Sequence, residues 1–401
     1  MTKANKAMPK SRMTVVYVKQ PFPKTFSKSI MLVGPTPRSP EVDSWRPDAL
    51  RILKQLGYDG VVFVPEPKDG KWRHNYEGQI ETEEKMLNRA DCIVCWIPRN
   101  MQTMPALTTN DEYGTWKQSG KVVFGAPKDA PSVRYQEYYA RKLGIPTHDT
   151  LEATLKSAVE RLGVGAKRVG SECQVPLYIW QTQSFQQWYR NMREAGNRLE
   201  GARVEWTFRT SKNRSFVFVW VLHVDIFVAS ENRRKTNEVV IARPDIAAVL
   251  AYRPGKTLMD TVVVLVKEFR SPVSNSKGFV FELPGGSSLK PDKNPEQVAA
   301  EELFEETGLS VEAWRFQKHG SRQLAATFSA HHAHLFSVEL TEKEIAELRK
   351  TAGAPHGVEA DSERTYVEVK KLSEVMQGDS CVDWSMLGML LSVLNERKTG
   401  K

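Results

Sequence analysis

The 401-residue sequence has few cysteines and no long apolar run. Four cysteines are too few for a disulfide framework in a chain of this length, so a reducing compartment, the cytoplasm, is expected. A membrane-spanning helix needs about 18 apolar residues in a row. The longest candidate, 216–228, is interrupted by His223 and Asp225. The N-terminal segment carries lysines but no apolar signal core, which argues against secretion.

The sequence also lacks a block of lysine and arginine with interleaved aromatic residues. Lysine and arginine number 57 against 48 acidic residues, which gives a net charge of +9. This excess favours anionic ligands, either nucleic acid or small phosphorylated molecules. Without an aromatic and basic block, a small nucleotide or nucleoside is the expected ligand, and nucleic acid is not expected. A nucleic-acid-binding regulator remains an alternative class, whose binding would depend steeply on salt.

The length allows two or three domains with their own cores. Residues 1–28 predict a flexible basic tail. Short strands alternating with helices predict an α/β domain with a doubly wound parallel sheet over 29–165. Small and polar residues at 166–175 predict a linker, and a second domain is expected over 176–401.

The carboxyl ends of the expected parallel strands are the expected place for a ligand. A strand at 14–18 is predicted within the tail region. The first domain is predicted to have strands at 30–33, 60–64, 94–97 and 121–125, and helices at 46–56, 81–89 and 150–162. The turn that begins with Gly34 and Pro35 follows the first of these strands, so both residues are expected to bind substrate.

In the second domain, a strand end at 279–283 and a Gly-rich turn at 284–286 lead into an acidic helix. Asn294 is a suitable N-cap, Pro295 suits the first helical position, and Gln297 completes a capping box. These signals predict that the helix begins directly after Asn294.

Three carboxylates on this helix, Glu302, Glu305 and Glu306, have the spacing i, i+3 and i+4 and share one face. Like charges at this spacing cost about 0.2–0.5 kcal/mol per pair. A hard divalent cation, Mg²⁺ or Mn²⁺, would turn that repulsion into binding. The plainer alternative is a solvated acidic helix.

The segment resembles the Nudix box, in which a Gly is followed by five residues, a Glu, seven residues, and Arg-Glu-aliphatic-any-Glu-Glu-any-Gly-aliphatic. The matching residues are Gly286, Glu302, Leu303, Glu305, Glu306, Gly308 and Leu309. The first loop is one residue longer than the pattern, Lys293 occupies the place of the first Glu, and Glu301 that of the Arg. The resemblance implies an α/β/α sandwich over about 200–395.

The same resemblance implies hydrolysis of a nucleoside diphosphate linked to another group, such as ADP-ribose, an NAD-like molecule or a modified nucleotide. It implies Glu302, Glu305 and Glu306 as ligands of Mg²⁺ or Mn²⁺, with Gly286 in the substrate loop. The segment around Arg270 is similar to the one before the box in ADP-ribose pyrophosphatases, so Arg270 is expected to contact substrate. Glu282 is a further candidate for a metal contact, and Glu359, Asp361 and Glu363 are candidates for the general base.

In the first domain, a strand, a polar loop and Glu-x-Gly at Glu112 resemble the nucleoside 2-deoxyribosyltransferase family over about 30–165. The resemblance implies that Glu112 attacks the anomeric carbon of a sugar and forms a covalent glycosyl-enzyme. Asn110 and Asp111, directly before it, are expected to bind substrate. Such domains commonly complete their sites across a subunit interface, so a homo-oligomer is one expectation.

Two family acids have no counterpart at the expected places. The Asp that handles the base falls at Pro98 or Arg99, and the acid before the nucleophile falls near Ala106. An N-glycosidase and a pure binding domain therefore stay open beside a transferase.

Two further patterns have the spacing of metal sites. Cys92-x-x-Cys95 lies in an expected strand, where the two side chains would face opposite sides of the sheet. His332 and His334 would share a strand face, but the sequence offers no partners for zinc. Both patterns are expected to be structural.

These observations predict a cytoplasmic, two-domain nucleotide-processing enzyme. One domain would cleave or transfer an N-glycosidic bond, and the other would hydrolyse a pyrophosphate. The alternative is a nucleotide sensor, in which one or both domains bind without turnover.

Overall fold

The computed structural model describes residues 13–39, 41–69, 78–210, 216–287, 293–357, 363–377 and 381–396. The chain divides into two compact units, Met1–Val239 and Val240–Lys401. This division differs from the expected one, because 176–239 group with the first unit and not with the second. Of the expected tail, 1–12 lie outside the described residues, whereas 13–28 are described and contain the strands β1 (Thr14–Tyr17) and β2 (Thr25–Phe26), so these residues belong to the folded unit.

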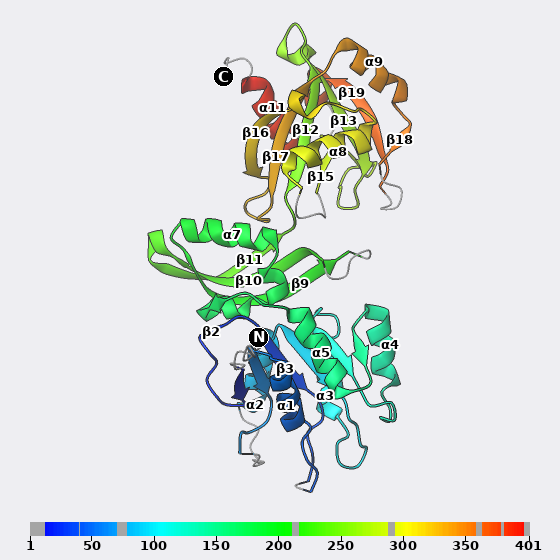
Figure 1. The fold of residues 1–401 in the computed structure, drawn as a ribbon. Coiled ribbons are helices and arrows are strands. Elements are labelled where there is room, and N and C mark those ends of the chain that lie inside the picture. Colours follow the sequence, from blue (N-terminus) through cyan, green and yellow to red (C-terminus); the bar gives the residue numbers. More distant parts are fainter. Residues whose placement is uncertain are drawn as a thin grey trace, which may run out of the picture. The chain divides into compact units, whose positions relative to one another are not determined.

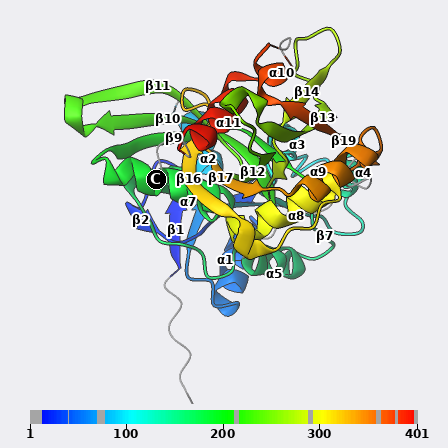
Figure 2. The same ribbon diagram turned by 90° about the horizontal axis from the view of Figure 1, so that it is seen from above.

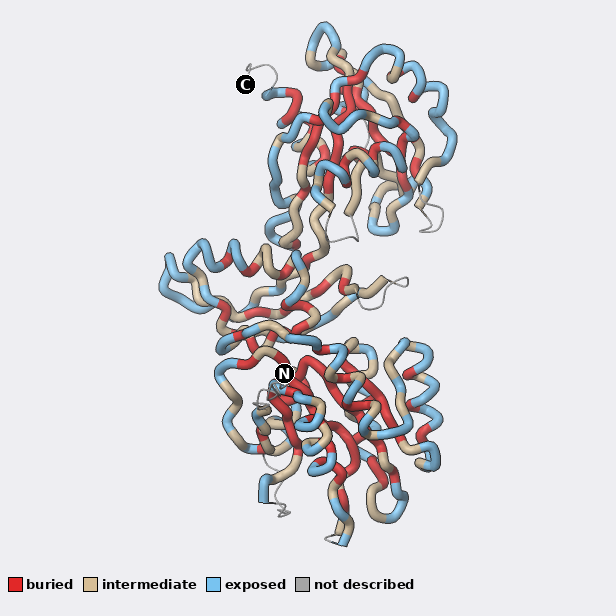
Figure 3. The backbone as a smooth tube through the Cα atoms, viewed as in Figure 1, coloured by how far each residue is buried: buried red, intermediate tan, exposed pale blue. Residues whose placement is uncertain are grey.

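Six parallel strands form the main sheet of the first unit, in the order β1-β4-β3-β5-β6-β7 (Figure 1). They are β1 (Thr14–Tyr17), β3 (Ser29–Val33), β4 (Val61–Val64), β5 (Cys92–Trp96), β6 (Val122–Gly125) and β7 (Thr147–His148). Of these strands, β7 was not predicted. The central strands are buried along their whole length, as Figure 3 shows, because helices cover both faces.

The helices lie in two layers, which makes this sheet the doubly wound sheet that was expected. Helices α1 (Arg46–Gln55) and α5 (Leu151–Leu162) pack into one core, and α2 (Gln79–Arg89), α3 (Leu107–Trp116) and α4 (Arg134–Leu143) pack into the other. Cys92 lies in the first core and Cys95 in the second. The two thiols therefore face opposite sides of the sheet, and both are buried and free.

The rest of the first unit begins at β8 (Arg168–Val169), which pairs with β2 (Thr25–Phe26) in a small two-stranded sheet. It contains the 3₁₀ turn η1 (Gly170–Gln174), the helices α6 (Leu177–Trp180) and α7 (Gln183–Glu194), and the long antiparallel strands β9 (Arg198–Arg209), β10 (Val217–Val228) and β11 (Arg233–Ala242). Figure 2 shows β10 and β11 as two long neighbouring strands. Trp220 of β10 packs against Phe185 and Trp188 of α7.

A buried ion pair joins this segment to the main sheet. Arg168 and Asp91 are both fully buried, and the guanidinium donates to both carboxylate oxygens at 2.8 and 2.6 Å. Asp91 also accepts from the backbone N–H of Leu177 at 2.7 Å. The expected linker is thus an integral part of the first unit.

The second unit has a mixed sheet in the order β16-β17-β12-β13-β19-β18. Its strands are β12 (Ile246–Arg253), β13 (Val262–Phe269), β16 (Gln317–Gln323), β17 (His332–Glu339), β18 (Pro355–His356) and β19 (Thr365–Lys371). Two short strands, β14 (Phe279–Glu282) and β15 (Gly285–Gly286), pair with β13 and β12. Only the β12–β17 pair among them is parallel within the described residues.

Helices cover both faces of this sheet. Helices α8 (Pro295–Thr307) and α9 (Glu342–Thr351) pack on one face, and α10 (Leu372–Gln377) and α11 (Trp384–Glu396) on the other. Helix α8 begins at Asn294 with the predicted capping box and ends at the left-handed Gly308. These layers agree with the expected sandwich, whereas membership of the Nudix family stays a prediction.

Candidate functional site

A cavity of about 560 Å³ opens at the carboxyl edge of the parallel sheet. The turn after β3 contributes Gly34 and Pro35 to its wall, and the segment after β4 contributes Pro65. The remaining wall comes from Arg46 of α1, from α2, and from α3 with the residues directly before it, and Glu112 of α3 is part of it. In the strand order, β3 lies between β4 and β5, so the cavity is at the point where the chain switches direction along the sheet.

Glu112 is not alone in this cavity. Glu83 of α2 lines the same wall and accepts a hydrogen bond from Gln79 Nε2 at 2.8 Å. Burial raises the pKa of Glu112 to about 7, with a further contribution from the negative charge of Glu83. Burial also raises the pKa of Glu83. Both carboxyl groups are therefore protonated more readily than an exposed glutamate.

The turn after β3 has a fixed shape. Arg46 is buried and donates to the backbone oxygens of Leu32 and Gly34 at 3.2 and 2.7 Å. Its charge is balanced by Glu66 at 2.6 Å. A Cβ atom on Gly34 would lie 2.2 Å from the backbone oxygen of Trp96, so only glycine fits there.

Asn110 and Asp111 do not line the cavity. The side-chain oxygen of Asn110 instead accepts hydrogen bonds from Arg99 and, at 2.7 Å, from Gln136. Arg99 also donates to the backbone oxygen of Ser132 at 2.6 Å. The residue at the place of a family acid thus holds the loop after β5 against α3, and substrate binding by Asn110 and Asp111 finds no support in this arrangement.

A sequence model of the family described as nucleoside 2-deoxyribosyltransferase like matches residues 27–130. This part of the chain contains β3, β4, β5 and every wall of the cavity. The chain carries a nucleoside 2-deoxyribosyltransferase-like domain. Comparison with curated proteins finds no match. Among the described residues, no helix is long and apolar enough to cross a membrane.

The deoxyribosyltransferase-like domain suggests that the protein is an enzyme that processes nucleosides, with a small-molecule substrate. The match to the family ends before the acidic helix of the second unit. That helix and its surroundings must therefore be judged from their own geometry.

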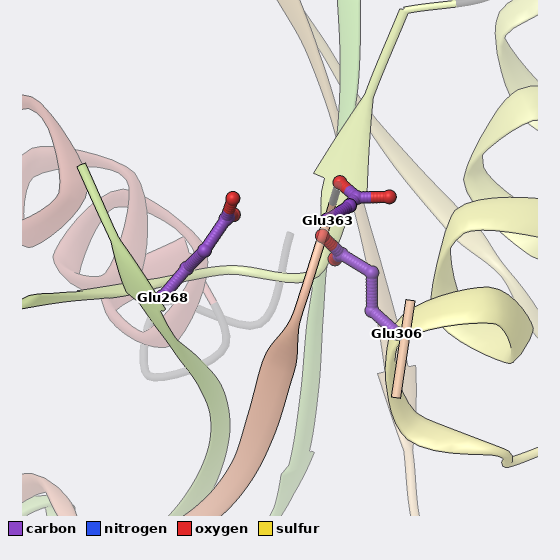
Figure 4. Close-up of side chains that lie close together, drawn as sticks. All are labelled: Glu268, Glu306 and Glu363. Carbon is purple, nitrogen blue, oxygen red and sulfur yellow. The ribbon is translucent and has the colours of Figure 1, made fainter. Parts of the chain in front are cut away.

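In the second unit, Glu306 of α8, Glu268 of β13 and Glu363 before β19 bring carboxylate oxygens within 4.8 Å of one another. Figure 4 shows that the three side chains come from separate segments and point toward a common space. Burial raises the pKa of Glu306 well above its usual range, and the charges of Glu302 and Glu363 raise it further. Burial raises the pKa of Glu268 to about 7. Negative charge concentrated in this way favours a bound cation.

The three predicted metal ligands of α8, Glu302, Glu305 and Glu306, have different surroundings. Glu306 belongs to the cluster, and one of its oxygens accepts from the backbone N–H of Gly285 at 2.8 Å. Glu302 is half-buried beside Gly286, where a Cβ atom would lie 2.5 Å from its carboxylate oxygen. Glu305 is exposed and lies outside the cluster. The Gly-rich turn therefore gives the helix carboxylates room, and Glu306 is the member at the centre.

Arg270 contacts the acidic site directly. It donates to Glu282 at 2.9 Å and forms an ion pair with Glu268 at 2.8 Å. Arg243, whose guanidinium donates to Ser287 at 3.1 Å, is a second cation at this site. Burial lowers the pKa of Arg243, and the positive charge of Arg270 lowers it further. Two guanidinium groups beside a carboxylate cluster can bind the anionic oxygens of a phosphorylated substrate.

The two departures from the Nudix pattern contact each other. Lys293, at the place of the first Glu, forms an ion pair with Glu301, at the place of the Arg. The pattern has an acid first and a base second, and this chain has the opposite order. The charge reversal at one position is thus matched by the reversal at the other.

The donor set fits a hard divalent cation. Three carboxylates from three segments offer oxygen ligands only, which suits Mg²⁺ or Mn²⁺ and not zinc. Sequence reasoning missed Glu268 as a ligand and nominated Glu363 only as a base. No pattern in the sequence singled out Glu268, because its strand meets the segment before the Gly-rich turn only in the folded sheet. Glu359 and Asp361 lie outside the described residues.

The histidines of β17 interact with the carboxylate of Asp245. His334 Nε2 lies 3.2 Å from Asp245, which also accepts from the backbone N–H of His332 at 2.8 Å. This arrangement agrees with the structural role that was expected.

Proposed function

We propose that the deoxyribosyltransferase-like domain cleaves or transfers the N-glycosidic bond of a nucleoside or nucleotide, with Glu112 as the nucleophile. The observation that carries this proposal is the presence of two carboxylates, Glu112 and Glu83, in the wall of one cavity. Opening a glycosidic bond by a covalent route needs an ionised carboxylate for the sugar carbon and a proton for the leaving group.

The reaction would proceed in two balanced steps. The carboxylate of Glu112 attacks the anomeric carbon, a C–O bond forms, and the C–N bond breaks with its electrons leaving on the base. Glu83 gives its proton to the departing base. Water or the nitrogen of an acceptor base then attacks the same carbon, the C–O bond to Glu112 breaks, and Glu83 takes up the proton of the incoming group.

Mass spectrometry tests this proposal. Protein incubated with a panel of nucleosides and nucleoside monophosphates should gain the mass of the sugar moiety on the peptide that contains Glu112, and free base should appear. Glu112→Gln should abolish both signals. Free base without an acceptor product identifies a hydrolase, whereas neither adduct nor free base from any member of the panel would reduce the domain to a binding module.

For the second unit we propose metal-dependent hydrolysis of a nucleoside diphosphate-linked substrate. The carboxylate cluster Glu268, Glu306 and Glu363 supports this, together with the helix that resembles the Nudix box. When bound, Mg²⁺ or Mn²⁺ would screen the negative charge of two linked phosphates. Glu306 would hold the ion, and Arg270 would exchange a carboxylate partner for a phosphate oxygen.

The test is phosphate-ester hydrolysis of ADP-ribose, NAD and dinucleotides with Mg²⁺ or Mn²⁺. Release of AMP that requires the metal and is lost in Glu306→Gln would support the proposal. Saturable ligand binding without turnover under any metal would move this unit to the alternative class, a nucleotide sensor. That outcome leaves the proposal for the first domain untouched, because the two reactions have different substrates and products.

A further inference from the structure

A second cavity in the first unit lies outside the residues that match the deoxyribosyltransferase family. It has a volume of about 490 Å³ and is formed by the segment after α5, the η1 turn and the helices α6 and α7. It shares no lining residue with the cavity that contains Glu112. A ligand here would therefore not compete for the proposed reaction site.

The floor of this cavity is aromatic and held in place. Trp180 and Tyr189 line it, are at most 9% exposed, and have ring centroids 5.2 Å apart. Gln186 donates to the backbone oxygen of Trp180 at 2.6 Å, and the hydroxyl of Tyr189 donates to Glu172. The indole N–H of Trp180 has no hydrogen-bond partner among the described residues. Both rings also pack against Phe185, so the floor offers the small exposed part of each ring and one unused donor to a planar ring.

The rim of the cavity is basic. Lys167, Arg190 and Arg193 line it, and Arg193 lies over the ring of Tyr189 at 5.8 Å from its centroid. Within the described part of the chain, the side chains of Lys167 and Arg190 form no ion pair or hydrogen bond. Two acids line the cavity, Glu172 and Glu194. The carboxylate of Glu172 already accepts hydrogen bonds from the hydroxyl of Tyr189 and, at 2.7 Å, from the backbone N–H of Val169. Donors that are available to a ligand therefore exceed acceptors.

We propose that this cavity binds a nucleoside phosphate as a ligand that is not turned over. An aromatic floor accepts a base, and a rim of guanidinium and ammonium groups accepts the phosphate oxygens. A neutral nucleoside would leave the basic rim unused, and inorganic phosphate would leave the aromatic floor unused. The two halves of the cavity together select a molecule that carries both groups.

Equilibrium dialysis with radiolabelled AMP tests this site, with EDTA present so that the carboxylate cluster of the second unit holds no metal. We expect saturable binding to the Glu112→Gln variant, which prevents turnover and keeps this cavity intact. In that background, Arg190→Gln with Arg193→Gln should remove one bound AMP per chain, or weaken its binding by at least tenfold, while any AMP bound in the Glu112 cavity is unchanged. Arg141→Gln, which changes an exposed arginine of α4, is the matched control and should bind as tightly as the parent.

Adenosine and inorganic phosphate complete the experiment, each as a competitor of AMP. Each should compete at least tenfold more weakly than unlabelled AMP does. Phosphate that competes as well as AMP would overturn the proposal, because the cavity would then be a simple anion site. AMP binding that is unchanged by the double arginine substitution would overturn it too. Thermal melting of each variant checks that its fold is unchanged, since Arg190 and Arg193 are exposed helix residues.

Discussion

The two candidate reaction sites use the same residue type in opposite arrangements. In the first unit, Glu112 and Glu83 line one open cavity and share it with the turn after β3. In the second, Glu268, Glu306 and Glu363 converge within 4.8 Å. In the first site the carboxylates are part of the wall of a cavity that can admit a substrate, whereas in the second they surround one point, as ligands of a cation do. The placement of the acids, and not their residue type, distinguishes the two proposed chemistries.

The largest effect is expected at Glu112. Replacement by Gln removes the nucleophile and should lower glycosidic cleavage by roughly a thousandfold or more, as loss of a catalytic nucleophile does elsewhere. The measurement is release of free base under single-turnover conditions. Asp111→Asn is the control, because its side chain is adjacent in sequence but does not line the cavity. Equal losses in both variants would contradict the assignment.

The next largest effect should separate Glu306 from Glu305. Glu306→Gln removes a buried member of the cluster and should weaken Mg²⁺ or Mn²⁺ binding on the order of 100-fold or more. The exposed Glu305→Gln should have a much smaller effect. The melting temperature with and without metal provides a readout that needs no substrate. Identical metal responses in the two variants would show that the cluster is not the metal site.

The pH dependence of the first site sharpens the comparison further. Attack requires ionised Glu112, whose raised pKa of about 7 predicts that the rate falls as the pH drops through 7. Glu83→Gln removes a negative neighbour that raises the pKa of Glu112, so the fall in rate on the acidic side of the pH profile should move to lower pH. The maximal rate should also fall, because Glu83 is the proposed proton donor. If the pH at which the rate falls is unchanged in Glu83→Gln, the two carboxylates do not interact.

The smallest effect is expected at the reversed ion pair of the second unit. Lys293 and Glu301 are partly exposed, so their interaction should contribute only about 0.2–1 kcal/mol. Lys293→Glu and Glu301→Lys should each lower thermal stability slightly, and the double exchange should restore it. Additive losses in a double-mutant cycle would show that the two residues do not compensate one another.

Local patterns in the sequence predicted the elements that local forces determine. The central strands of the parallel sheet, β3 to β6, are mainly apolar runs, and the capping box at Asn294 and Gln297 marks the start of α8. The start of this helix was therefore predicted to the residue. Its cluster partners were not, because Glu268 and Glu363 reach Glu306 only through pairing of β13 with β19.

In the first site, too, one carboxylate could be identified from a local sequence pattern and the other only from the folded structure. Glu112 was identified because it lies in a short motif, whereas Glu83 belongs to a helix that carries several other acids. Only the packing of α2 beside α3 at the cavity distinguishes it from its neighbours. The boundary of the first unit was missed for a related reason, since the contact between Arg168 and Asp91 spans 77 positions of the chain.

That buried pair also limits how this chain can exchange parts with other proteins. A gene fusion that moved residues 27–130 alone would leave the carboxylate of Asp91 inside the sheet without Arg168. An uncompensated buried charge of this kind costs about 3–5 kcal/mol, which is a large share of the stability of most domains. The transferable module therefore extends beyond the residues that carry the family resemblance, at least to the N–H of Leu177 that caps the same carboxylate.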